Sequence, residues 1–154
     1  MNDNYAKSIN LVHQLREKIE DELKQYYEKD KILDYDPSKF YVAGGNPEIF
    51  VKNNLEQNFL IYIIPISDCS KLKDEKFLQK ITDGFNNNLA DNLLAKRYNL
   101  DKNNLIKHLP IYINYTSKEN SFDIQRRKNV EFIILNENEI DNFSISNYLS
   151  DNGE

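Results

Sequence analysis

Cysteine, glycine and proline are scarce in this chain, and tryptophan is absent: its 154 residues include one Cys, four Gly and four Pro. The lone Cys69 cannot form a disulfide within the chain, and no CxxC pair is present to bind a metal. No apolar run approaches the length of a membrane-spanning helix. The sequence therefore predicts no disulfide scaffold, no metal site, no cofactor and no membrane span.

Basic charge is also in short supply, with 20 Lys and Arg against 25 Asp and Glu and a formal net charge of -5. Proteins that bind nucleic acid carry a basic patch, so we expect no nucleic-acid partner. The length and the 40% hydrophobic content fit one domain, and we expect residues 1–154 to form it. Residues 1–4 are polar and do not resemble a signal peptide. We expect a cytoplasmic protein, or one of the periplasm or cell envelope if a leader has been removed.

Apolar residues at three- and four-residue steps predict an amphipathic helix over residues 4–29. Most of its other positions are charged or polar, and we interpret these charges as a solvated face. The apolar stripe consists of Ile9, Val12, Leu15, Ile19, Leu23 and Tyr26, and the charged face includes Glu17, Lys18, Asp21, Glu22 and Lys24.

Two short apolar segments, 39–43 and 48–52, flank a Gly-Gly-Asn-Pro turn and predict a β-hairpin over residues 39–53. Residues 59–66 are apolar throughout, which is typical of a central strand with both faces buried. These segments place a β-sheet directly after the helix.

The second half of the chain alternates helical and extended patterns. Apolar side chains at four-residue steps predict a helix over residues 74–97, in which we expect Phe85 to be buried. Strands are predicted at 105–115, where Pro110 should interrupt the strand or mark its edge, and at 130–135.

Residues 136–154 form an acidic tail, in which apolar side chains predict a short docked helix or strand; these are Ile140, Phe143, Ile145, Tyr148 and Leu149. The order of elements predicts an α+β fold. We expect a mixed β-sheet with helices packed on one face, preceded by the N-terminal amphipathic helix.

Four segments between residues 59 and 135 share the order of motifs of a known family. Ser67-Asp68 follows a strand, as Thr-Asp does in the family's Gly-His/Tyr-Thr-Asp motif. Residues 81–93 match the helix that carries Leu-Ser-x-x-Arg-Ala, and residues 98–105 are similar to the turn that follows it. Residues 125–132, Gln-Arg-Arg-Lys-Asn-Val-Glu-Phe, look like the closing Asn-Arg-Arg-Val-Glu-Ile strand. The chain thus resembles the OmpA-like domain, the peptidoglycan-binding module of OmpA, Pal and MotB, with the β/α order of that domain.

In that family, the motif aspartate and a helix arginine hold the ammonium and carboxylate of diaminopimelate. Asp68 keeps the anion, but the position of the arginine falls on Phe85. The resemblance therefore implies a ligand site at Asp68 in which Arg126 and Arg127 are the candidate cations. Each has a plainer alternative, since Asp68 can be a loop or cap residue and the arginines can belong to a solvated loop.

These observations leave two functional hypotheses. The first is a non-catalytic OmpA-like docking module of a bacterial cell-envelope or secretion assembly, without standard diaminopimelate binding. The second is a small cytoplasmic interaction factor, such as an immunity, inhibitor or phage-derived protein, whose acidic surface meets a basic partner. Both predict a protein partner. We expect no enzyme, because no acid, base and nucleophile converge by motif, and no motif places a carboxylate beside His13 or His108.

Overall fold

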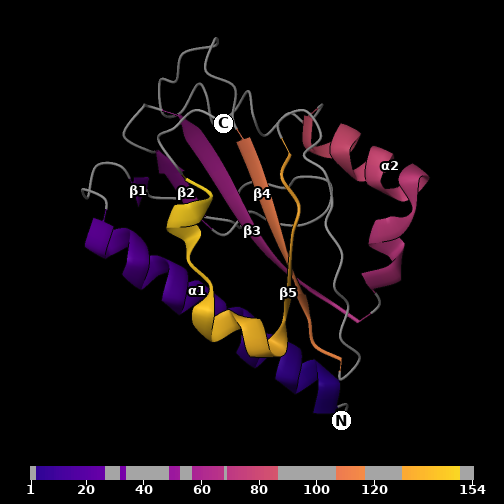
Figure 1. Cartoon of the computed structure of the whole chain (residues 1–154), viewed down its shortest axis with the longest axis horizontal. Coiled ribbons are helices and arrows are strands. Elements are labelled where there is room, and N and C mark those ends of the chain that lie inside the picture. Colours follow the sequence, from indigo (N-terminus) through magenta and orange to yellow (C-terminus); the bar gives the residue numbers. More distant parts are fainter. Residues whose placement is uncertain are drawn as a thin grey trace.

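A computed structural model shows an α+β fold in which a five-stranded mixed sheet lies between helical layers (Figure 1). The helices are α1 (Asp3–Tyr26) and α2 (Glu75–Asn86). The strands are β1 (Ile32–Leu33), β2 (Ile49–Lys52), β3 (Asn58–Ile66), β4 (Lys107–Asn114) and β5 (Ile133–Asn136), and the 3-10 helices are η3 (Cys69–Lys73), η4 (Glu137–Asn142) and η5 (Ile145–Asn147). The structure describes residues 3–26, 32–33, 49–52, 57–67, 69–86, 107–116 and 130–149.

The strands follow one another across the sheet in chain order, so β3 is central, as its apolar sequence predicts. β2 pairs with β1 and with β3 in antiparallel orientation, whereas β3 and β4, and then β4 and β5, pair in parallel. A parallel pair needs a long crossover, and α2 lies within the one between β3 and β4. The mixed sheet and the N-terminal helix are thus confirmed.

The prediction that the helices pack on one face of the sheet is wrong, because α1 and α2 cover opposite faces. Alternate residues of β3 divide between two cores: Phe59, Ile61 and Ile63 contact the apolar stripe of α1, whereas Leu60 and Tyr62 join the core beneath α2. The physical reason lies in the sequence of β3 itself. A strand that is apolar on both faces needs cover on both faces.

Only the second strand of the predicted hairpin lies within the described residues. Residues 49–52 form β2, but the backbone of β2 pairs with β1 at Phe50 and Val51 and with β3 along its whole length. Both edges of β2 are therefore occupied at those two residues. The predicted partner strand 39–43 lies outside the described residues, as do residues 87–97 of the predicted second helix and the side chain of Phe85.

Pro110 lies inside β4, where a residue without an N–H would normally break the ladder. The carbonyl of His108 accepts from the amide of Glu131 at 3.0 Å, so residue 108 faces β5, and residue 110 faces the same way. The pairing of β4 with β5 is interrupted at this point: it has an isolated bridge between His108 and Val130 and continues only from Ile111 onward. The missing donor thus falls opposite a gap in the β4–β5 pairing.

Candidate functional site

The residues that the sequence nominates for a ligand site, Asp68, Arg126 and Arg127, lie outside the described residues. Their neighbours Ser67 and Cys69 follow the carboxyl end of β3. In open sheets with parallel strands, ligands often bind beyond that end of the strands. The polar groups at this edge are therefore the first candidates for a ligand site.

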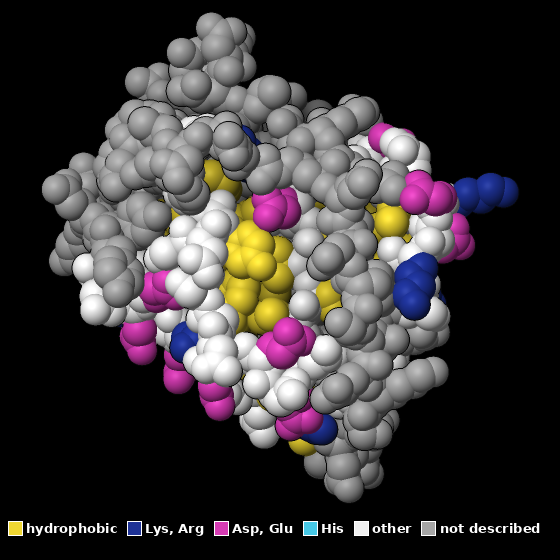
Figure 2. Space-filling view, in the orientation of Figure 1, with side chains coloured by type: hydrophobic (Ala, Val, Ile, Leu, Met, Phe, Trp, Pro, Cys, Tyr) yellow, Lys and Arg dark blue, Asp and Glu magenta, His cyan; other side chains and the backbone are white. Residues whose placement is uncertain are grey.

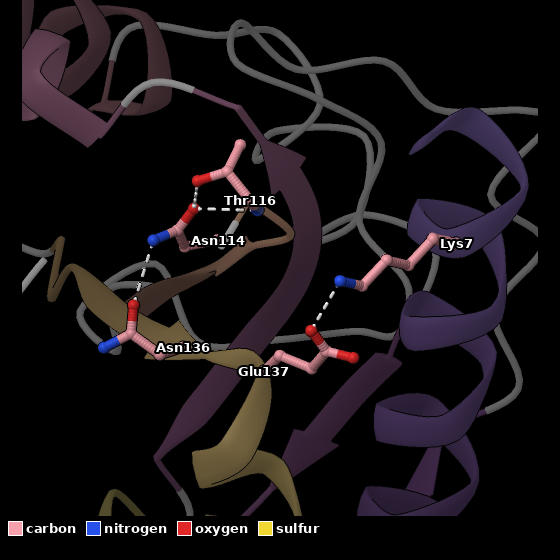
Figure 3. A network of polar contacts seen from close by, with 5 residues as sticks. All are labelled: Lys7, Asn114, Thr116, Asn136 and Glu137. Carbon is pink, nitrogen blue, oxygen red and sulfur yellow. Dashed lines mark hydrogen bonds and ion pairs between the residues drawn. The ribbon is translucent and has the colours of Figure 1, made fainter. Parts of the chain in front are cut away.

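A chain of hydrogen bonds occupies this edge (Figure 3). Asn114, at the end of β4, is fully buried and donates from Nδ2 to Oδ1 of Asn136, at the end of β5, over 3.0 Å. Its own Oδ1 accepts from the Thr116 amide at 3.2 Å and from the Thr116 hydroxyl at 2.7 Å. The backbone amide of Asn136 donates to Glu139 Oε1 at 2.8 Å. These side chains satisfy one another and fix the start of η4, so we assign them a structural role.

A groove of about 970 Å³ lies between α1 and the C-terminal segment. We call residues 137–149 the C-terminal strap, and the cavity the α1 groove. Four carboxylates and one ammonium line it, which gives a formal charge of -4 + 1 = -3. The lining residues are Gln14, Glu17, Lys18, Asp21, Glu22 and Gln25 on α1, and Asp141, Asn142, Phe143, Ser144 and Ser146 on the strap. Figure 2 shows acidic side chains following one another along α1.

The strap runs beside α1 in the same chain direction. Polar contacts join the two segments in matching order, and the first of them is drawn in Figure 3. They connect Lys7 Nζ with Glu137 Oε2 at 2.6 Å, Gln14 Nε2 with Asp141 Oδ1 at 3.1 Å, and Glu22 with residues 144–146. Beneath them, the strap inserts Ile140, Phe143, Ile145 and Leu149 into the core that contains α1. The predicted docking of the C-terminal apolar residues is confirmed.

Glu22 makes the most extensive of these contacts. Its carboxylate accepts hydrogen bonds from the hydroxyls of Ser144 and Ser146 at 2.5 Å each, and from the amides of Ile145 and Ser146 at 3.0 Å each. Burial by itself raises the pKa of Glu22, but the four hydrogen bonds to the ionised form outweigh it, and the net pKa is lowered. The interpretation of Glu22 as part of a solvated face is therefore wrong. Its partners are 122 to 124 residues away in the sequence, and no local sequence pattern identifies them.

The two histidines do not form a common site. His13 is exposed on α1, whereas His108 is fully buried in β4. The hydroxyl of Tyr62 on β3 and Nδ1 of His108 are 2.7 Å apart, and their rings stack with centroids 5.8 Å apart. Both side chains have no solvent exposure, so the pair holds the two central strands together.

No protein-family model, curated protein or solved structure matches this chain. Within the described ranges there is no group of three or more His, Cys, Asp or Glu side chains arranged to hold a metal ion. None of the described helices has both the length and the apolar character to cross a membrane. The α1 groove is thus the feature from which a function can be argued.

Proposed function

We propose that this protein is a small, non-catalytic interaction factor that binds a basic segment of a partner protein in the α1 groove. The carrying observation is the charge of the groove, in which carboxylates from α1 and from the strap face one cavity. An acidic surface on a chain of net charge -5 attracts cationic partners and orients them during encounter.

The spacing of the carboxylates suits more than one cationic side chain. Glu17 and Asp21 are exposed and lie four residues apart on α1, which corresponds to a rise of about 6 Å. Like charges at this spacing repel one another, and a bound Lys or Arg relieves that repulsion. Asp141 stands on the opposite wall, while Gln25 and Asn142 offer uncharged hydrogen-bonding groups. Basic side chains from one extended or helical segment therefore fit between the two walls.

A fluorescent peptide of twelve residues, rich in Lys and Arg, is a suitable probe of the groove. In anisotropy titrations at low salt, Glu17→Gln/Asp21→Asn should bind it about five- to thirtyfold more weakly, since each exposed ion pair contributes about 0.5–1 kcal/mol. The matched control is Glu75→Gln/Asp83→Asn on α2, which changes the net charge equally on the opposite face of the sheet. Equal losses of affinity in both variants would mean that the peptide responds to the net charge of the protein and not to the groove, which would count against the proposal. No loss of affinity in the groove variant would overturn it.

The second candidate function is an OmpA-like docking module of a bacterial cell-envelope or secretion assembly. It is supported by the parallel pairing of β3 and β4 around α2, because β3 is the strand that the resemblance aligns with the family's Thr-Asp motif. Replacement of the helix arginine by Phe85 leaves the carboxylate of diaminopimelate without its cation, so we expect no saturable binding to purified sacculi. Saturable binding that disappears in Asp68→Ala would show instead that the pocket is intact.

A further inference from the structure

We propose that the last part of the C-terminal strap, residues 143–149, is a clasp on α1 that the ionised carboxylate of Glu22 keeps closed and that opens more often when this carboxylate gains a proton. The observation behind the proposal is that all four donors to Glu22 come from three consecutive residues. One carboxylate therefore fixes both the backbone and the side chains of the turn at η5.

Two other polar contacts between α1 and the strap are more exposed and therefore weaker. Lys7 and Glu137 form an ion pair whose side chains are 38% and 48% exposed, and the bond from Gln14 to Asp141 is exposed as well. Exposed contacts of this kind contribute little to stability. Glu22 is half-buried and bonds to half-buried serines, where bonds to an ionised acceptor are about twice as strong as those between neutral groups.

Protonation weakens this arrangement for a simple reason. A carboxylate accepts through both oxygens, whereas a neutral carboxyl group carries an O–H donor on one of them. That donor would face the Ser144 hydroxyl or the Ser146 hydroxyl and amide, all of which now donate to Glu22. A serine hydroxyl can turn and accept from that donor, but the backbone N–H groups of residues 145 and 146 cannot. The negative charge that strengthens all four bonds is also gone, so residues 144–146 are held less firmly on α1.

The lowered pKa of Glu22 sets the direction of the pH dependence. Its ionised form stabilises the closed clasp above the ordinary pKa of 4.5, and this stabilisation is lost as the pH falls through the lower pKa of the closed state. The other titratable groups that face the groove are Glu17, Lys18 and Asp21 from α1 and Asp141 from η4, while η5 contributes none. Glu22 therefore shares the groove with three other carboxylates and one ammonium. Variants are therefore needed to assign the effect.

Opening of the clasp also affects the groove, because Phe143, Ser144 and Ser146 form part of its wall. Loss of this wall would weaken binding of a basic segment in acid. This consequence rests on the proposed function, whereas the opening itself does not. The two are separated by measuring the clasp in the absence of any partner.

Amide hydrogen exchange followed by NMR on the full chain tests the clasp directly. In the wild-type protein, protection of the Ile145 and Ser146 amides should fall between pH 6 and pH 3.5, relative to protection of Ile61 in β3. In Glu22→Gln, their protection at pH 6 should already be at least about tenfold lower, equivalent to about 1.4 kcal/mol, and should no longer follow pH. The matched control is Glu17→Gln, which removes the same charge from the same helix and should behave as the wild type does.

Unchanged protection of these amides in Glu22→Gln, or an equal loss in Glu17→Gln, would overturn the proposal. If Glu22→Gln does not fold, Ser146→Ala serves in its place, since it removes one of the four donors and should give a smaller loss confined to residues 143–149. Loss spread evenly over the sheet in Ser146→Ala would mean that the strap does not open as a local unit. Peptide binding that fails while the clasp behaves as expected would count against the proposed function alone.

Discussion

The buried pair of Tyr62 and His108 offers a sharp test of how polar groups contribute to this core. Their side chains, on the neighbouring strands β3 and β4, share a hydrogen bond of 2.7 Å and have no solvent exposure. Tyr62→Phe keeps the aromatic ring and its apolar contacts but removes the hydroxyl. Nδ1 of His108 then loses this partner in a place that water does not reach.

The expected cost follows from the asymmetry of buried hydrogen bonds. Removing one partner of such a bond costs about 1–3 kcal/mol, whereas replacing both partners by apolar groups costs much less than two single losses. Tyr62→Phe and His108→Leu should therefore each lower the free energy of unfolding by about that amount. The double variant should be more stable than the sum of the single effects implies, by on the order of 1 kcal/mol or more.

Chemical denaturation with urea, followed by far-ultraviolet circular dichroism, measures all four proteins. The slope of unfolding free energy against urea should stay the same, so that midpoint changes report stability alone. Additivity of the two single effects within about 0.5 kcal/mol would refute the reasoning, because it would show that the two side chains are energetically independent.

Three other predictions concern single side chains. Ile145→Ala should cost about 2–5 kcal/mol in urea denaturation, because the side chain is fully buried beneath the strap, whereas Ile9→Ala, at 38% exposure, should change stability by less than about 0.5 kcal/mol. Burial raises the pKa of Tyr112 from 10.0 to about 12. Stability should therefore fall as the pH rises from 10 toward 12, by up to about 1.4 kcal/mol per pH unit, and the fall should be smaller in Tyr112→Phe. Asn114→Ala should cost about 1–3 kcal/mol, because it leaves the end of β5 without its bond from β4, and thermal unfolding would register the loss.

Much of the fold can be predicted from the sequence, because period and composition are local signals. The stripe of α1 is confirmed at Leu15, Ile19 and Leu23, although Ile9 is exposed and Leu11, which was not predicted, is buried. The apolar run of β3 is buried on both faces over residues 59–63. The side of the sheet that each helix covers could also have been inferred, since a strand buried on both faces excludes cover on one face alone. The pairing of β2 with β1 could not be predicted, because a two-residue strand such as Ile32–Leu33 is too short to show an alternation of apolar and polar residues.

The groove was harder to foresee, and Glu22 shows why. Its charge suggests a solvent-facing residue like Glu17 and Asp21. On a helical wheel, however, it lies beside Leu15, seven residues before it, and therefore within the apolar stripe of α1, whereas Glu17 and Asp21 lie on the polar side. This position is a signal of partial burial, but it does not identify the partners of Glu22, which lie more than 120 residues later and face its carboxylate only after the strap has docked. Apolar residues such as Ile140 and Leu149 predict the docking, but the polar contacts of the clasp above them do not follow any periodic pattern in the sequence. In this protein, burial is therefore encoded locally, whereas the charge pattern of the groove arises only from the meeting of the two ends of the described chain.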